Sequence, residues 1–118
     1  MYRLLVAGVF MVGSIHGGEL AEMQKAQSEF DEKYFEINGG FEKVRHVLLH
    51  LVKTTGKMAT YCEAKEHGKE IPGPEQVINE VLPDLLIHAL QLANYYGIDL
   101  EEKYGERIRF IINRSEKK

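Results

Sequence analysis

The most apolar segment of the chain runs from Gln76 to Tyr96 (QVINEVLPDLLIHALQLANYY) and predicts a buried helix. Its apolar residues cover most of the helix circumference, and they are Ile78, Val81, Leu82, Leu85, Leu86, Ala89, Leu90, Leu92 and Ala93. One polar line interrupts them, at spacings of four, three and four residues, and consists of Asp84, His88, Gln91 and Tyr95. Buried polar groups need partners, so we expect this line to face a second polar surface.

Two amphipathic helices are predicted before this segment. The first runs from Glu19 to about Phe35, and its face opposite the apolar residues is expected to be charged and solvated. The second runs from about Phe41 to Glu66. Gly56 in the second helix would allow close approach of another backbone. The expected apolar positions are Leu20, Met23, Ala26, Phe30 and Tyr34 in the first helix and Val44, Val47, Leu48, Leu51, Val52, Met58, Ala59 and Cys62 in the second.

A second polar line accompanies the core face of the helix from Phe41 to Glu66. It consists of His50, Thr54, Lys57 and Tyr61, with the same spacings of four, three and four residues. Matched lines on consecutive long helices suggest that they face each other across a polar crevice. The alternative is that the second line merely faces water, and periodicity alone slightly favours this alternative.

A fourth helix is predicted near the end of the chain. Gly97 suits the end of the preceding helix, and Asp99 suits an N-cap. Glu101 and Glu102 would then lie in the first turn, where the helix dipole favours anions. We expect residues 115–118 to fray.

Residues 1–18 form an apolar N-terminal extension, separate from the predicted helical domain of residues 19–114. Its apolar run from Leu4 to Ile15 is too short to span a bilayer as a helix, so we expect no stable membrane insertion. Three alternatives remain open: a strand or extra core segment, a secretory signal without a clear cleavage site, or a start site misassigned upstream of Met23.

Composition narrows the function classes. The 118-residue chain has a net charge of -3 and a pI near 6.0, which argues against a nucleic acid partner. Its single cysteine, Cys62, excludes an internal disulfide framework, so we expect a reducing, cytoplasmic compartment.

Three segments resemble the MazG-like, all-α nucleoside triphosphate pyrophosphohydrolase superfamily. The strongest is LLIHALQLANYYGIDLEEKYGERIRFIIN, from Leu85 to Asn113, and the others are FDEKYF from Phe30 to Phe35 and HLVKTTGKMATYCE from His50 to Glu63. The resemblance covers roughly residues 20–114. It implies an all-α bundle of about four helices that self-associates as a dimer or tetramer, with Mg²⁺ and a nucleoside triphosphate bound between the second and third helices.

The metal motifs of that superfamily are only partly present. Its members carry Glu-x-x-Glu on one helix and Glu-x-x-Asp on the next, because Mg²⁺ prefers oxygen ligands. Here Thr54 and Lys57 stand at the two glutamate positions of the first motif. Val81 stands at the glutamate position of the second motif, and only Asp84 matches. We therefore expect a Lys57–Asp84 ion pair in the metal position. In the alternative, acids nearby compensate, and the candidates are Glu63, Glu66 and Glu80.

The phosphate-binding positions match better. Arg109 and Asn113 stand at the superfamily's basic-x-x-x-Asn positions, which in relatives contact substrate phosphates, and Arg114 follows. The alternative is a solvated basic helix end. Further candidates for substrate contact are Lys57, His50, Thr54, His88 and Tyr61.

The histidines allow another hypothesis. His46, His50 and His88 with Asp84 would suit a transition metal, although a hydrogen bond between His88 and Asp84 is the preferred interpretation.

Two functions are thus predicted. One is a nucleotide pyrophosphohydrolase with a remodelled Mg²⁺ site; the other is a non-catalytic nucleotide-binding or interaction protein in which Lys57 replaces the metal.

Overall fold

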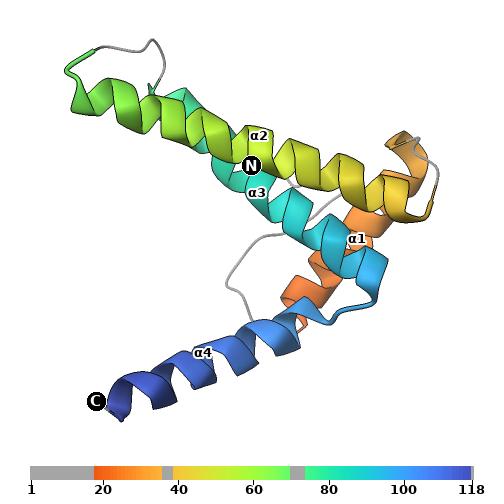
Figure 1. Cartoon of the computed structure of the whole chain (residues 1–118). Coiled ribbons are helices and arrows are strands. Elements are labelled where there is room, and N and C mark those ends of the chain that lie inside the picture. Colours follow the sequence, from red (N-terminus) through yellow and green to blue (C-terminus); the bar gives the residue numbers. More distant parts are fainter. Residues whose placement is uncertain (1–17, 36–38, 70–73, 118) are drawn as a thin grey trace. The chain divides into compact units, whose positions relative to one another are not determined.

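A computed structural model of the chain describes residues 18–35, 39–69 and 74–117, and these ranges contain four helices and no strand (Figure 1). The helices are α1 (Glu19–Tyr34), α2 (Phe41–Glu66), α3 (Pro74–Tyr96) and α4 (Leu100–Glu116). The predicted all-α class is therefore confirmed, together with the order and approximate bounds of the helices. The alternatives for the N-terminal extension concern residues outside the described ranges, except for Gly18.

The end of α3 and the start of α4 follow the sequence signals. Gly97 has a φ of 64°, and the next N–H, of Ile98, donates to the carbonyl of Ala93 at 2.8 Å, which closes the last turn of α3. The Asp99 side chain accepts a hydrogen bond from the N–H of Glu102 at 3.2 Å and so caps α4. Helix α4 continues through Glu116, two residues into the segment predicted to fray.

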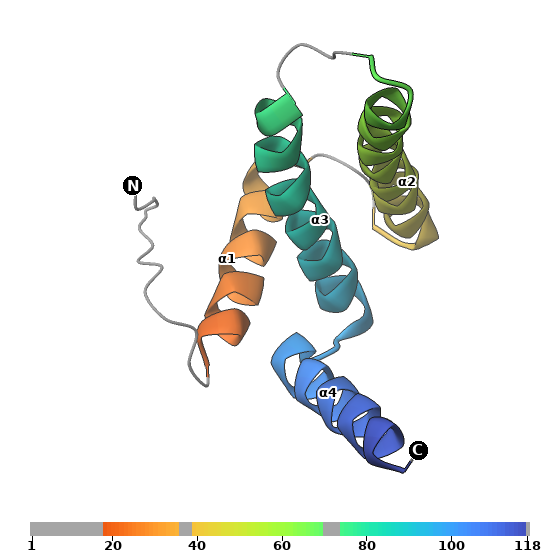
Figure 2. The same cartoon turned by 90° about the vertical axis from the view of Figure 1, so that its left-hand side faces the viewer.

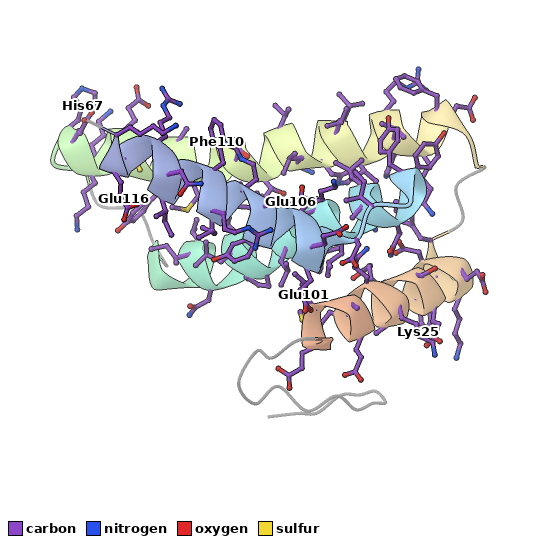
Figure 3. The ribbon with its side chains drawn as sticks, turned by 90° about the horizontal axis from the view of Figure 1, so that it is seen from below. Lys25, His67, Glu101, Glu106, Phe110 and Glu116 are labelled. Atoms are coloured by element: carbon purple, nitrogen blue, oxygen red, sulfur yellow. The ribbon has the colours of Figure 1, made fainter. Side chains whose placement is uncertain are left out.

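The chain forms two compact units. One consists of Gln24–Ile98 and contains most of α1, all of α2 and all of α3. The other joins the first residues of α1 to α4, where the Gly18 N–H lies 2.9 Å from both carboxylate oxygens of Glu101 (Figure 3). The predicted polar lines therefore lie in one unit, and the predicted phosphate-binding residues of α4 lie in the other.

Helices α2 and α3 pack side by side and run in opposite directions (Figures 1 and 2). The buried apolar residues of the described ranges lie on these two helices and are Val44, Val47, Val81, Leu90 and Ala93. Burial of a valine or leucine side chain stabilises a fold by roughly 1.5–3 kcal/mol. This small apolar core holds the two helices together.

The buried apolar surface is narrower than the sequence pattern predicts. Val52 on α2 is 68% exposed and Leu82 on α3 is 57% exposed, although both were expected in the core. Cys62 is exposed as well. A Cβ atom placed on Gly56 would meet no atom of the described residues within 4 Å, so none of them makes the close approach predicted at this glycine. Helix α2 packs closely against α3 alone among the described helices, and α3 is only partly covered by its neighbours, which leaves part of the apolar surface of each helix in solvent.

Helix α1 contacts α3 through polar residues, contrary to the predicted apolar contact. Its buried residues are Gln24 and Asp31, whereas Phe30 and Tyr34 are 55% and 61% exposed. The Asn94 amide of α3 explains this, because it accepts from Gln24 Nε2 at 3.2 Å and donates to the Gln24 carbonyl at 2.8 Å. The face expected to be solvated thus supplies the contact. None of the helices in the described ranges has the length and apolar character of a membrane span.

Candidate functional site

The two predicted polar lines meet where Thr54 of α2 contacts His88 of α3. The Thr54 hydroxyl oxygen lies 3.3 Å from Nε2 of His88, and Thr54 is 6% exposed. Depending on the imidazole tautomer, the hydroxyl either donates or accepts. The two lines therefore meet at Thr54 and His88, whereas His50 and Lys57 of the α2 line are exposed, as the alternative in which that line faces water predicts.

Three histidine rings form a cluster at this contact, two from α2 and one from α3. The ring centroids of His46 and His50 lie 4.4 Å apart, and those of His50 and His88 lie 6.3 Å apart. His46 and His50 are one helical turn apart on α2, so the helix itself places their rings together. Phe35 packs against the far side of His46, with 5.4 Å between ring centroids. The cluster therefore joins two turns of α2 to one residue of α3.

His88 has one ring nitrogen without a partner. Its Nε2 faces Thr54, while its Nδ1 is buried and forms no hydrogen bond to any described residue. The expected hydrogen bond between His88 and Asp84 is therefore absent, and that prediction is wrong. Rotation of the ring toward α2 explains the difference, because Nε2 reaches the hydroxyl across the helix pair and not the carboxylate one turn earlier.

The cluster alters the protonation of its most exposed imidazole. The pKa of His50 is lowered below 6.5, first because partial burial disfavours the charged ring and then because His46, Lys53 and His88 repel a positive charge there. These neighbours are all cationic when protonated. At neutral pH the cluster thus favours a neutral His50.

The remaining residues of the two lines do not join this contact. Gln91 turns toward α1 instead and donates from Nε2 to Asp31 Oδ1 at 3.1 Å. Lys57 is exposed and Asp84 is half-buried, and no ion pair joins them in the structure. Tyr61 is half-buried, and Tyr95 packs edge-on against Tyr96 at 4.9 Å between ring centroids.

The residues at the superfamily's metal positions do not fit a four-carboxylate Mg²⁺ site. Val81 is 1% exposed and belongs to the apolar core, and the Thr54 hydroxyl is engaged with His88. The alternative acids Glu63, Glu66 and Glu80 are exposed, and no three His, Cys, Asp or Glu side chains gather as a ligand set within residues 18–35, 39–69 and 74–117. Asp84 alone cannot supply the oxygen ligands that Mg²⁺ requires.

The predicted phosphate-binding residues Arg109, Asn113 and Arg114 all lie on α4 and are exposed. The neighbouring Arg107 guanidinium lies over the ring of Phe110, 5.2 Å from its centroid, so part of the basic surface of α4 is occupied by a cation–π contact. Their unit is separate from the helix pair, so the structure assigns them no place beside Thr54 and His88.

Two groups of polar residues escaped the sequence-based selection. Lys53 follows His50 by three residues and extends the cationic surface, a spacing that was visible in the sequence. Asp31, which accepts from Gln27 at 2.9 Å and from Gln91, belongs to a line of Gln24, Gln27 and Asp31 at spacings of three and four. That line has the same helical rhythm as the two lines that were recognised.

No family model, curated protein or solved structure matches this chain.

Proposed function

We propose that the chain is a divergent MazG-like protein that binds a nucleotide through the facing polar surfaces of α2 and α3. The observation that carries this proposal is the contact between Thr54 and His88, because it joins the two polar lines that the resemblance assigns to the nucleotide crevice. The four-helix order of the described residues is compatible with the same family.

The first candidate activity is Mg²⁺-dependent release of pyrophosphate from a nucleoside triphosphate. In this candidate Asp84 is retained as a ligand and Glu63, Glu66 or Glu80 assists, while Arg109 and Asn113 of the other unit remain separate candidates for phosphate contact. Incubation of the pure protein with a panel of nucleoside triphosphates and Mg²⁺ or Mn²⁺ tests it, with pyrophosphate as the readout. We expect Asp84→Asn to abolish any release, and no release above background would end the enzymatic candidate for those substrates.

The second candidate is a non-catalytic nucleotide-binding protein. The burial of Val81 and the engagement of Thr54 favour it, since two positions that hold carboxylates in relatives serve here in packing and in a neutral hydrogen bond. The chelator response separates the candidates. In the non-catalytic candidate, nucleotide binding should raise the melting temperature by mass action, and equally with and without a metal chelator. An increase that requires Mg²⁺ would instead favour the enzyme.

We also propose that the chain self-associates as a dimer or tetramer. The exposed apolar residues of α3 support this, since Leu82, Leu86 and Ile87 are 57%, 39% and 36% exposed. Sedimentation equilibrium of the wild type and of Leu82→Lys measures the assembly. A wild type that stays monomeric at high concentration would end this part of the proposal.

A further inference from the structure

We infer that His46, His50, Lys53 and His88 form a binding site for an oligophosphate anion, in which protons take the charge-neutralising role that metal ions have in the superfamily. The inference deepens the proposed function and rests on it only for the identification of the ligand as a nucleotide. The cluster would also accept inorganic triphosphate, because both ligands present the same chain of phosphate oxygens.

The structure brings imidazole and ammonium N–H donors together on neighbouring parts of α2 and α3. His46 and His50 lie on adjacent turns with ring centroids 4.4 Å apart, and His88 approaches from α3 with its centroid 6.3 Å from that of His50. Lys53, three residues after His50, is exposed, and so is His50 itself. These two residues are the ones that a ligand in solvent can contact directly. Charge-assisted hydrogen bonds from imidazolium and ammonium groups to phosphate oxygens are strong contacts of this type.

His46 and His88 are less exposed than His50, so they would act on a bound anion through their charge when protonated more than through direct contact. His46 is half-buried between His50 and Phe35, and His88 directs Nε2 at Thr54. The buried Nδ1 of His88 forms no hydrogen bond within the described residues, so no described acceptor stabilises a proton on that nitrogen. An anion bound at the exposed edge of the cluster would supply that stabilisation through space.

The acids around the cluster leave its charge uncompensated. On α2 the nearest in sequence is Glu42, one turn before His46; on α3 it is Asp84, one turn before His88; and on α1 Asp31 accepts from Gln27 and Gln91. No ion pair in the described ranges involves Lys53 or a histidine of the cluster. The lowered pKa of His50 agrees with this arrangement, because partial burial and then repulsion by His46, Lys53 and His88 lower it, and no carboxylate of the described residues is among its causes.

Binding of an anion should therefore be linked to proton uptake. The phosphate charges favour the imidazolium form of His50, so its pKa is higher in the complex than in the free protein. Between these two pKa values the complex holds more protons, and affinity rises as the pH falls. One proton taken up corresponds to at most tenfold in affinity per pH unit, so we expect about three- to tenfold tighter binding at pH 6.5 than at pH 7.5.

Isothermal titration calorimetry tests the inference with the full chain in the presence of a metal chelator. Inorganic triphosphate and adenosine triphosphate are titrated separately at the two pH values, in two buffers of different ionisation enthalpy, which counts the protons taken up. Proton uptake by the ligands themselves is the same for every variant, so the difference between variants reports the cluster. We expect His50→Gln and Lys53→Gln each to weaken triphosphate binding about threefold or more.

The controls carry the same substitutions elsewhere in the unit. His67→Gln lies at the C-terminal end of α2 and Lys25→Gln lies on α1, and both residues are exposed (Figure 3). Both control variants should bind like the wild type. Asp84→Asn should tighten binding, because it removes the negative charge nearest His88 in sequence, whereas the same variant abolishes activity in the enzymatic candidate. Circular dichroism of each variant excludes loss of the fold as the cause.

The outcomes separate this inference from the proposed function. If the wild type and His50→Gln bind nucleotide equally strongly and with the same proton uptake, the inference about the cluster is overturned and the proposed function is left intact. Binding of triphosphate with proton uptake, but no binding of any nucleotide, would support the cluster and end the proposed function. Binding of neither ligand would overturn both.

Discussion

Helix α3 is held on two sides by contacts of different chemistry. Toward α1 it presents Gln91 and Asn94, whose amides pair with Asp31 and Gln24. Toward α2 it presents His88, which meets Thr54 and the His46–His50 pair beside an apolar core. Amide groups do not titrate near neutral pH, but imidazoles do. The difference indicates that the α1–α3 contact serves packing near neutral pH, whereas the α2–α3 contact can respond to protons and anions.

The α2–α3 contact depends most on its apolar core, so the largest effect should come from a charge placed there. Val47 is 2% exposed, and Val47→Asp should cost about 3–5 kcal/mol of unfolding free energy or prevent folding. Val52→Asp changes helix propensity in the same way on the same helix, but at a residue that is 68% exposed, and should cost under about 1 kcal/mol. Urea denaturation measures both. Equal losses would show that the core is not where the structure places it.

The α1–α3 contact should be next in sensitivity, through Asp31. Asp31→Ala leaves the Gln27 and Gln91 amide donors without their acceptor, at a cost of about 1–3 kcal/mol. Asp31→Asn retains an acceptor oxygen at the same position and should lose less. Glu32→Ala, on the exposed face of α1, is the control in the same denaturation series. If Asn is as damaging as Ala, the negative charge matters more than the hydrogen bonds.

The polar part of the α2–α3 contact should contribute less. Thr54→Val is nearly isosteric but removes the hydroxyl that faces Nε2 of His88, and should cost about 1–2 kcal/mol. Thr55→Val is the matched control one residue later, because the Thr55 hydroxyl bonds only to the Leu51 carbonyl of its own helix at 2.9 Å and is exposed. A Thr54→Val variant as stable as Thr55→Val would show that the contact contributes little.

The smallest expected effect is the dependence of stability on pH. The pKa of His50 is lower in the folded protein than its ordinary value of 6.5, so the unfolded chain binds more protons between the two values. Stability should therefore be fully present above pH 6.5 and decline as the pH falls toward the folded pKa. Because His50 is exposed, salt should weaken the effect. Melting temperatures from pH 7.5 to 6.0 should decline less in His50→Gln than in His67→Gln; equal declines would assign the dependence to other groups.

Local signals predicted the helices well because their causes are local. The αL glycine at Gly97 and the N-cap at Asp99 depend only on the residues of one turn, and both have the expected conformation. The polar line of α3 was recognised from its spacing, and a polar crevice shared with the α2 line was one of two alternatives. What spacing could not supply was the partner of each side chain along the line.

The errors share one physical origin, which is that periodicity identifies faces but not neighbours. Phe30 looked like a core residue because it is apolar, yet the polar face of α1 is the one that α3 can satisfy with Gln91 and Asn94. In the same way His88 was assigned to Asp84, its neighbour within the helix, although its partner comes from another helix. Partners between helices follow from packing, which depends on all three elements at once.

The two-sided contact of α3 also constrains the length of the chain. His88 serves α2, while Gln91 and Asn94, three and six residues later, serve α1. Each residue added to a helix rotates everything after it by about 100°. An insertion between His88 and Gln91 would therefore separate the two contacts in angle, even if every original side chain were retained. This stretch should consequently accept many substitutions on its exposed side but very few insertions or deletions. The number of residues between His88 and Gln91 is therefore more constrained than their identity.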